Sequence, residues 1–207
     1  MLFRSFAKIV LCRLFAFLII LIATKNSAES QGVDRKILEA IQNLPPKSQC
    51  DTLNKLGYQL GKNRKFDSAL LFLSDALIKS KKINYLEGQA RALNYLGVVA
   101  YNNKTPIVAL SYLRQSLIIA EKEKNLELIA INYSNLGEVY LTDHQGRQAL
   151  NSLLMALPLA KQAAISEDIN ALTRLQYLYF SLNSAYISLK NYDSANIYLA
   201  AAYKLNE

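Results

Sequence analysis

Residues that could carry out chemistry are scarce in this chain of 207 residues, which contains one histidine and two cysteines. His144 is the only histidine available as a general base, and nucleophilic catalysis would need a serine, cysteine or acid arranged around it. No such arrangement is recognisable, so we interpret His144 as a solvent-exposed turn residue. A structural zinc site takes about four cysteine or histidine ligands, and a disulfide scaffold takes several paired cysteines. The sequence therefore predicts no catalytic residue, no metal and no cofactor.

One segment has a superficial likeness to a phosphate-binding loop. Gly57 and Gly61 precede Lys62, but three residues separate the glycines where a P-loop has four, and no Ser or Thr follows the lysine. Acid pairs such as Glu121 and Glu123 lie at predicted helix ends near lysines, as solvated residues usually do. We therefore expect that the protein is not an enzyme.

The start of the chain has the layout of a secretory signal peptide. Residues 1–13 contain three basic residues and no acid, residues 14–23 are uncharged and apolar, and small residues follow up to Ala28. An apolar run of ten residues is too short for a helix that spans a bilayer core, which takes about 20. We predict a signal peptide at residues 1–28, cleaved after Ala28. The alternative is an uncleaved N-terminal membrane anchor.

The net charge of +8 comes in large part from this first segment. Its removal would halve the charge, because it takes away four basic residues and no acid: Arg4, Lys8, Arg13 and Lys25. The other basic residues are scattered apart from a short run at 79–82, whereas nucleic-acid-binding domains show a dense basic stripe or a known motif. We therefore exclude nucleic acid as a partner.

A four-fold repeat organises the remainder of the chain. A Leu-Gly pair at 56–57 recurs at 96–97 and 136–137, at intervals of 40, and Leu-Asn follows at 182–183 after 46 residues. An alanine lies twelve residues after each Gly or Asn, at Ala69, Ala109, Ala149 and Ala195. A leucine lies four residues further on, at Leu73, Leu113, Leu153 and Leu199. Around each pair the apolar residues recur at i, i+3 and i+7, which predicts a helix with one apolar face.

These offsets resemble the tetratricopeptide repeat (TPR), whose frame is W-x2-L-G-x2-Y followed by A-x3-F. The resemblance covers residues 47–207, although Leu or Tyr replaces the Trp, Leu replaces the Phe, and the period is 40 where TPRs have about 34. A HEAT-like array also has a period near 40. The added residues all follow the second helix of each repeat, however, as in the long-repeat subfamily that includes kinesin light chains. The resemblance implies an all-α fold, a right-handed solenoid of about four helix-turn-helix repeats.

On this frame we predict helix pairs at 48–61 and 66–80, 85–102 and 106–123, 126–142 and 147–163, and 168–189 and 193–206. A short helix at 33–44, within a segment 29–46, would cap the first repeat. Thr105 before Pro106 predicts an N-cap followed by proline at the first helical position. Pro158 lies inside a predicted helix and favours a kink or an early end there, which would account for the interval of 46.

In proteins of this family the first helices of the pairs line a concave groove that binds a protein or peptide. The resemblance implies a groove at the residues beside each Leu-Gly pair: Asn54, Lys55, Tyr58, Arg91, Asn94, Tyr95, Tyr101, Ser134, Asn135, Glu138, Tyr177, Phe180, Ser181 and Ser184. Long-repeat relatives often have an Asn two residues before the Gly, and here only Asn135 keeps it. The alternative is that these residues are solvated polar side chains with no partner.

The order of segments along the chain, a predicted signal peptide followed by long repeats, also resembles the extracytoplasmic sensor part of certain bacterial histidine kinases and transcription regulators. That resemblance implies a second hypothesis, a sensory input module, stand-alone or truncated, of a signal-transduction system. We therefore expect a location in the bacterial periplasm or at the inner membrane, with membrane contact only through the N-terminal segment or a partner. The last predicted helix carries Ile197, Leu199 and Tyr203 with no further repeat behind it, so we also expect self-association there.

Overall fold

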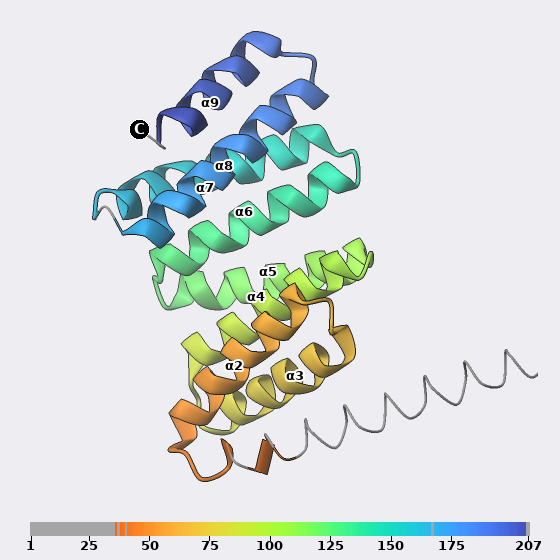
Figure 1. The fold of residues 1–207 in the computed structure, drawn as a ribbon, viewed down its shortest axis with the longest axis vertical. Coiled ribbons are helices and arrows are strands. Elements are labelled where there is room, and N and C mark those ends of the chain that lie inside the picture. The colour runs from red at the N-terminus through yellow and green to blue at the C-terminus, as the bar shows by residue number, and fades with distance from the viewer. Residues whose placement is uncertain (1–35, 37, 40, 167, 206–207) are drawn as a thin grey trace, which may run out of the picture. The chain divides into compact units, whose positions relative to one another are not determined.

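The computed structural model describes residues 36, 38–39, 41–166 and 168–205, and every regular element among them is an α-helix (Figure 1). The chain divides into two compact units, Met1–Pro45 and Pro46–Glu207. In the first unit, Lys36, Leu38, Glu39 and Ile41 are helical, whereas residues 42–44 form a turn and a bend, so the predicted end of the short helix at residue 44 is too late. The predicted signal peptide lies outside the described residues.

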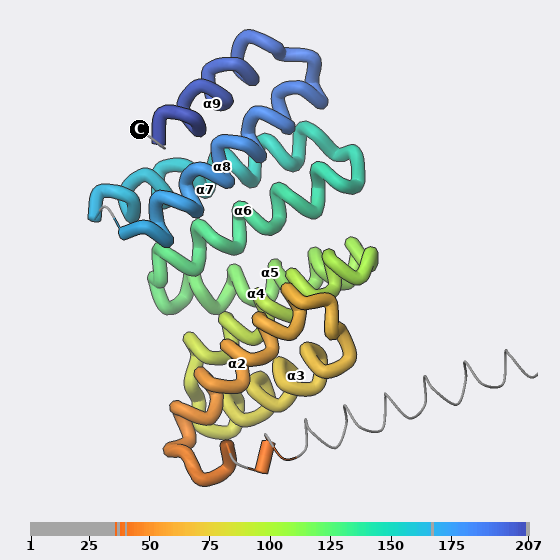
Figure 2. Tube along the Cα trace, viewed as in Figure 1, coloured from red at the N-terminus to blue at the C-terminus, as the bar shows by residue number. Residues whose placement is uncertain are grey.

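The second unit is an all-α solenoid of helix pairs that stack in chain order (Figures 1 and 2). Its helices are α2 (Pro46–Lys62), α3 (Phe66–Lys82), α4 (Leu86–Asn102), α5 (Pro106–Lys122), α6 (Leu126–Thr142), α7 (Gly146–Ala164), α8 (Ile169–Ser188) and α9 (Tyr192–Lys204). Each observed boundary lies within two residues of the predicted one. The first helices also contact one another from pair to pair, α2 with α4, α4 with α6 and α6 with α8. The first helices therefore form one continuous face of the solenoid.

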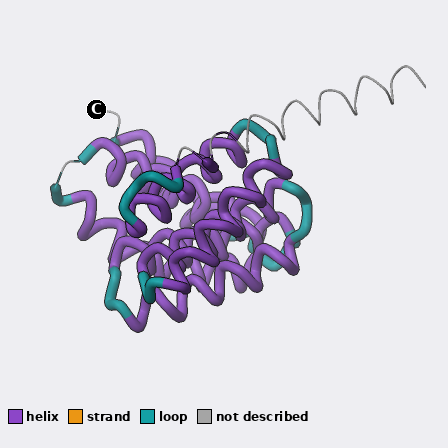
Figure 3. Tube along the Cα trace, turned by 90° about the horizontal axis from the view of Figure 1, so that it is seen from below, coloured by secondary structure: helices purple, strands orange, loops and turns teal. Residues whose placement is uncertain are grey.

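Three-residue loops join most of these helices, and each of these loops reverses the chain in the same way (Figure 3). The middle residue of the loop has a left-handed backbone conformation with φ between 52° and 62°, at Arg64, Asn84, Lys104, Lys124, His144 and Lys190. In the first loop the Arg64 N–H donates to Gly61 O at 3.1 Å and the Lys65 N–H donates to Leu60 O at 3.0 Å. These two bonds define a Schellman motif, which satisfies carbonyl groups at the helix end. The prediction that His144 is an exposed turn residue is confirmed.

The repeat glycines let the two helices of a pair approach closely. A Cβ atom added to Gly97 would lie 2.7 Å from Cγ of Leu113 and 3.3 Å from the carbonyl oxygen of Ala109. Gly57 and Gly137 have the same neighbours one repeat before and one repeat after. The helical glycine costs about 1 kcal/mol relative to alanine, and here it makes room for the fully buried leucine of the frame.

The core runs from pair to pair through the residues of the repeat frame. Ala69 and Leu73 of α3 pack against Leu96 and Val99 of α4. The same contacts recur between α5 and α6, and again between α7 and α8. Each pair thus buries its apolar face on the next pair, and a separate cluster of buried residues lies at each of these junctions, as expected for a repeat protein whose repeats contact only their neighbours.

The prediction for Pro158 is wrong where it allows an early helix end, because α7 continues past it to Ala164. The six extra residues of the fourth interval have another origin. Two of them lengthen the end of α7, one lengthens the loop to α8, and three lengthen the start of α8. The fourth interval is thus longer because its helices and loop are longer.

Thr105 occupies the predicted N-cap position of α5, and Pro106 follows it. The Thr105 hydroxyl does not cap the helix, however. It donates a hydrogen bond to the carbonyl oxygen of Ala100 at the end of α4, at 2.9 Å. The side chain therefore stabilises the turn between the helices.

Candidate binding groove

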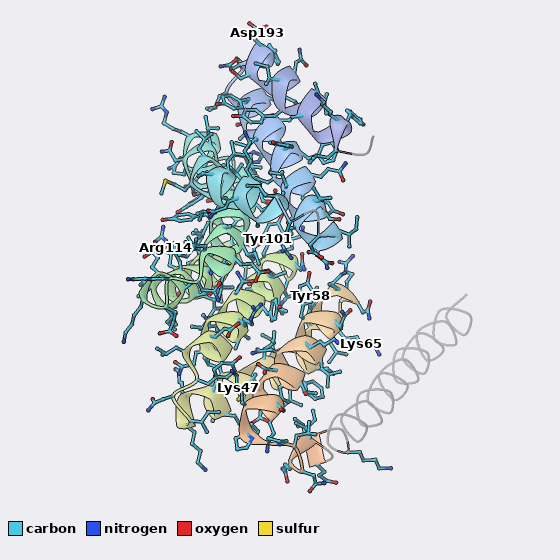
Figure 4. All side chains as sticks on the ribbon, turned by 90° about the vertical axis from the view of Figure 1, so that its left-hand side faces the viewer. Lys47, Tyr58, Lys65, Tyr101, Arg114 and Asp193 are labelled. Atoms are coloured by element: carbon cyan, nitrogen blue, oxygen red, sulfur yellow. The ribbon has the colours of Figure 1, made fainter. Side chains whose placement is uncertain are left out.

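A groove of about 770 Å³ lies over the first helices of the solenoid. Side chains from α2, α4, α6 and α8 line it, together with two from the end of α7. Its lining is Tyr58, Lys62, Arg91, Asn94, Tyr95, Val98, Glu127, Ala130, Ile131, Ser134, Asn135, Glu138, Ala160, Ala163, Asn170, Ala171, Thr173, Arg174, Tyr177, Leu178 and Ser181. Figure 4 labels Tyr58 on α2, at one end of this set.

A second cavity, of about 340 Å³, lies between α2 and the start of α4. Its lining is Asp51, Asn54, Lys55, Tyr58, Tyr85, Glu87, Arg91 and Tyr95. Tyr58, Arg91 and Tyr95 line both spaces, so the smaller cavity adjoins the groove. We call it the side pocket.

Most of the residues predicted from the sequence lie in these two spaces. The groove contains Tyr58, Arg91, Asn94, Tyr95, Ser134, Asn135, Glu138, Tyr177 and Ser181. Asn54 and Lys55 line the side pocket. Tyr101, Phe180 and Ser184 line neither space; the Tyr101 hydroxyl lies 3.0 Å from Thr142 Oγ1, and Phe180 packs edge-on against Tyr203.

The groove has an apolar and small-residue lining that sequence reasoning missed. Val98 and Ile131 come from α4 and α6, and Ala160 and Ala163 come from the end of α7. The added first turn of α8 contributes Asn170. The longer α7 and α8 of the fourth interval thus build one wall of the groove. The sequence did contain a signal for this wall. The interval of 46 residues from Gly137 to Asn183, where the others are 40, marks the place at which the chain departs from the repeat frame.

A chain of ion pairs crosses the groove from the second repeat to the fourth. The Arg91 guanidinium lies 2.9 Å from the carboxylate of Glu87 and 3.7 Å from that of Glu127. Arg174 of α8 lies 3.2 Å from the other oxygen of Glu127. Burial acts to lower the pKa of Arg91, but the hydrogen bond and charge of Glu87 outweigh it and the pKa is raised. Arg91 therefore stays charged, and Glu127 links α4, α6 and α8.

Two of the predicted asparagines form links between repeats. Asn94 is buried, and its Nδ2 donates to Asn132 Oδ1 at 2.9 Å while its Oδ1 accepts from Asn135 Nδ2 at 3.3 Å. Asn132 in turn donates to the carbonyl oxygen of Leu128 at 2.9 Å. Buried polar groups are normally satisfied in this way. Asn94 is therefore committed to holding α4 against α6, although it lies at the base of the groove.

Aromatic side chains mark both ends of the groove. Tyr58 and Tyr95 stack with ring centroids 4.6 Å apart, and Lys62 Nζ lies 5.7 Å from the centre of the Tyr58 ring. Burial raises the pKa of the Tyr95 hydroxyl above its ordinary value, which favours the neutral phenol. At the other end Tyr177 is 69% exposed although it lines the groove. Two polar side chains also meet across the repeats, where the Ser181 hydroxyl donates to the Glu138 carboxylate.

Neither a metal site nor a membrane span is found in the described part of the chain. There, no three His, Cys, Asp or Glu side chains are close enough together to hold a metal ion. Over the same residues, no helix has both the length and the apolar character needed to cross a membrane.

Among the solved structures that are similar to this chain are two helical repeat proteins. BtubC (BKLC) from P. vanneervenii superposes with a TM-score of 0.71 at 18% sequence identity, over 86% of this chain and 72% of that one. A kinesin light chain-like protein from Podosopora anserina with nearly identical TPR-like repeats has a TM-score of 0.57 at 15% identity, over 87% of this chain and 90% of its own. The fold is TPR-like. No family model matches the chain, and no curated protein matches its sequence.

At this level of identity the likeness concerns the fold alone. The TPR-like repeats agree with the frame of the sequence, including its likeness to the long-repeat type. The chain is an all-α helical repeat protein, and nothing in these two likenesses bears on sensor kinases.

Proposed function

We propose that this protein is a non-catalytic scaffold that binds a protein or peptide along the groove over α2, α4, α6 and α8. The observation that supports this most strongly is the groove itself, about 770 Å³ in volume with Tyr177 standing 69% exposed in its lining. An exposed, rigid aromatic side chain beside small residues is typical of the positions that dominate binding energy in protein interfaces.

The composition of the groove favours a peptide-like partner. Val98, Ile131 and Leu178 offer apolar contact, while Ser134 and Asn135 offer hydrogen bonds. The charges nearly balance, since three cations (Lys62, Arg91 and Arg174) face two carboxylates (Glu127 and Glu138). A peptide combines apolar side chains with regularly spaced donors and acceptors, which matches such a mixed surface.

Photo-cross-linking in the cells of origin tests this function. The photoreactive residue p-benzoylphenylalanine is placed at Tyr177 or, as the matched control, at Ile118, which is 65% exposed on α5 and does not line the groove. We expect a discrete cross-linked protein from position 177 and none from position 118. Equal labelling from both positions, or none from either, would contradict a groove-binding scaffold.

We further propose that the protein is exported, through a cleaved signal peptide at 1–28 or with that segment as an anchor at the inner membrane. The basic and apolar pattern of residues 1–23 supports this. The mass of the chain isolated from cells decides between the two forms, because cleavage after Ala28 removes the first 28 residues. A cytoplasmic chain that retains Met1 would contradict export.

A sensory role and self-association complete the proposal. A sensor would use the same groove for its stimulus and transmit through a partner, and a kinase or regulator that cross-links at position 177 would support it.

Self-association through α9 is supported by Ile197, 66% exposed, and Tyr203, 61% exposed. Light scattering of the purified chain would show a dimer or larger species, and a monomer at high concentration would contradict this part.

A further inference from the structure

Asn54 lies in the wall of the side pocket with one half of its amide unpaired. The side chain is only 2% exposed, and its Nδ2 donates to the carbonyl oxygen of Gly88 at 3.0 Å. Its Oδ1 is buried and has no hydrogen-bond partner. A buried acceptor without a partner destabilises the folded state, so this atom calls for a donor.

Turning the amide over would not remove the problem. The carbonyl oxygen of Gly88 can only accept hydrogen bonds, so Asn54 has to present its NH₂ group to it. The Oδ1 atom is then the part of the amide that still needs a donor, and because this atom is itself buried, an occupant of the pocket reaches it only when the side chains around it move aside. Such an occupant has to be a donor at this point.

The charges around the pocket favour a cationic donor. Asp51 accepts a hydrogen bond at 3.0 Å from Tyr85, a neutral hydroxyl, and no cation within the described residues is paired with it. Glu87 lies in the same wall, next to the doubly paired Arg91. The remaining cation, Lys55, has an exposed side chain. The pocket therefore presents one carboxylate without a cationic partner beside an unpaired amide oxygen.

The tyrosine rings of the pocket already attract cations within this chain. Lys47 Nζ lies 4.6 Å from the centre of the Tyr85 ring, and Lys62 Nζ lies 5.7 Å from the centre of the Tyr58 ring. Tyr95 stacks on Tyr58 and adds a third aromatic surface to the lining. Ring faces of this kind attract ammonium and guanidinium groups electrostatically.

We infer that the side pocket takes a basic side chain, arginine or lysine, of the peptide bound in the groove, with Asn54 Oδ1 and Asp51 as its acceptors. This inference rests on the proposed function, because the shared lining of the two spaces lets one peptide reach both. It adds a specificity to that function, a preference for partners with a basic residue at the end of the segment next to α2.

The inference is tested with small probes and the full chain. Blocked single residues (N-acetyl, N-methylamide) of arginine, lysine, citrulline and glutamate are titrated while backbone amide shifts are followed by NMR. Citrulline is the key control, because it has the shape of arginine without its charge. We expect saturable shifts at residues 54, 58 and 95 with arginine or lysine, and at least about fivefold weaker binding of citrulline.

A matched pair of variants separates Asp51 from general charge effects. Asp51→Asn keeps the shape and the acceptor for Tyr85, and we expect it to weaken arginine binding about two- to fivefold. Asp67→Asn, an exposed change at the start of α3 outside the pocket, should leave binding unchanged. Circular dichroism of both variants verifies the fold.

Three results would overturn the inference: equal binding of arginine and citrulline, stronger binding of glutamate, or no saturable shift with any probe, which would mean that water alone fills the pocket. These results are independent of the proposed function. Cross-linking at position 177 with no probe in the pocket would retain the groove and remove the basic side chain. Probe binding without any cross-linked partner would retain the pocket as a site for a basic side chain and remove the groove as a binding site for a protein.

Discussion

Asn183 donates a hydrogen bond from Nδ2 to the carbonyl oxygen of Ala195, at 2.9 Å. This is the same carbonyl of the repeat frame that an added Cβ on Gly57, Gly97 or Gly137 would approach to 3.3–3.4 Å. In the last pair a side-chain amide therefore replaces the close approach of two backbones. The leucine of the frame also differs in burial: Leu153 is fully buried and packs with residues of α8, whereas Leu199 of α9 is partly exposed.

The glycine frame leads to a first prediction. Gly97→Ala raises helix propensity, yet its Cβ would lie 2.7 Å from Cγ of the buried Leu113. Overpacking of this kind costs about 1–3 kcal/mol, so we expect the free energy of unfolding to fall in urea titrations.

Asn183→Ala is the matched comparison in the fourth pair. It removes a hydrogen bond without adding an atom to a crowded contact, and we expect a loss of about 1 kcal/mol. If Gly97→Ala proved as stable as the unchanged chain, close helix approach would not be what the glycine provides.

The left-handed loop residues lead to a second prediction. Lys104 has φ of 62°, a conformation that strains a residue with a Cβ and suits glycine. We expect Lys104→Gly to stabilise the protein by about 0.5–1 kcal/mol, seen as a higher thermal midpoint.

Lys161→Gly provides the control for that change. Lys161 is an exposed residue in the last turn of α7 with a helical backbone, where glycine lowers stability by up to about 1 kcal/mol. The two lysine-to-glycine changes should therefore have opposite signs, and a loss of stability in both would argue against the strained loop.

The asparagine link between the second and third repeats gives a third prediction. Asn94→Ala leaves the Asn132 Oδ1 and the Asn135 Nδ2 without their partner, in a largely buried place. We expect a loss of about 1–3 kcal/mol in the free energy of unfolding.

Asn135→Ala should cost less, because Asn135 is only half-buried and Asn94 keeps its bond to Asn132. Thermal unfolding of the two variants side by side provides the comparison. A greater loss of stability with Asn135→Ala than with Asn94→Ala would show that Asn94 is not the central residue of this hydrogen-bond network.

A fourth prediction concerns alkaline pH. Burial raises the pKa of the Cys50 thiol and of the Tyr95, Tyr179 and Tyr198 hydroxyls above their ordinary values of 9.0 and 10.0. The folded state thus holds these protons more tightly than the unfolded state does, and the stability they contribute is complete below pH 9. We expect the free energy of unfolding to fall as the pH rises above 9 and further above 10.

Chemical denaturation at pH 8, 9, 10 and 11 measures this dependence. Cys50→Ala should flatten the part of the curve that begins near pH 9, since it removes the group that titrates first. Stability that increased between pH 9 and 11 would contradict the direction of these pKa shifts.

Much of the fold could be predicted from the sequence because the repeat constrains it several times over. Leu96, Gly97, Ala109 and Leu113 have equivalents at fixed offsets, and each offset reports a contact within a pair or between neighbours. The same frame predicted which helices come first in each pair, and the TPR resemblance implied that these helices line the groove. The helix ends up to the start of α7 were predictable since the loops between them fall at a constant spacing, which the longer fourth interval then breaks.

The wall formed by α7 and α8 was not predictable from that frame. Ala163 and Asn170 lie among the extra residues of the fourth interval, where no other repeat provides an equivalent. The burial of Asn54 and Asn94 was equally hidden. Their partners, Gly88 and Asn132, lie in the next first helix, α4 and α6 respectively, and no local pattern records a contact across a repeat.

The central claim, binding along the groove, is tested most directly by the affinity of one peptide for matched variants. A peptide is selected from a random library on the full chain, and its dissociation constant is measured by fluorescence anisotropy. Tyr177→Ala removes the exposed aromatic of the groove, and Ile118→Ala removes a similarly exposed side chain outside it. We predict that Tyr177→Ala weakens binding about tenfold or more while Ile118→Ala leaves it unchanged. Equal affinities for the unchanged chain and Tyr177→Ala would contradict the account.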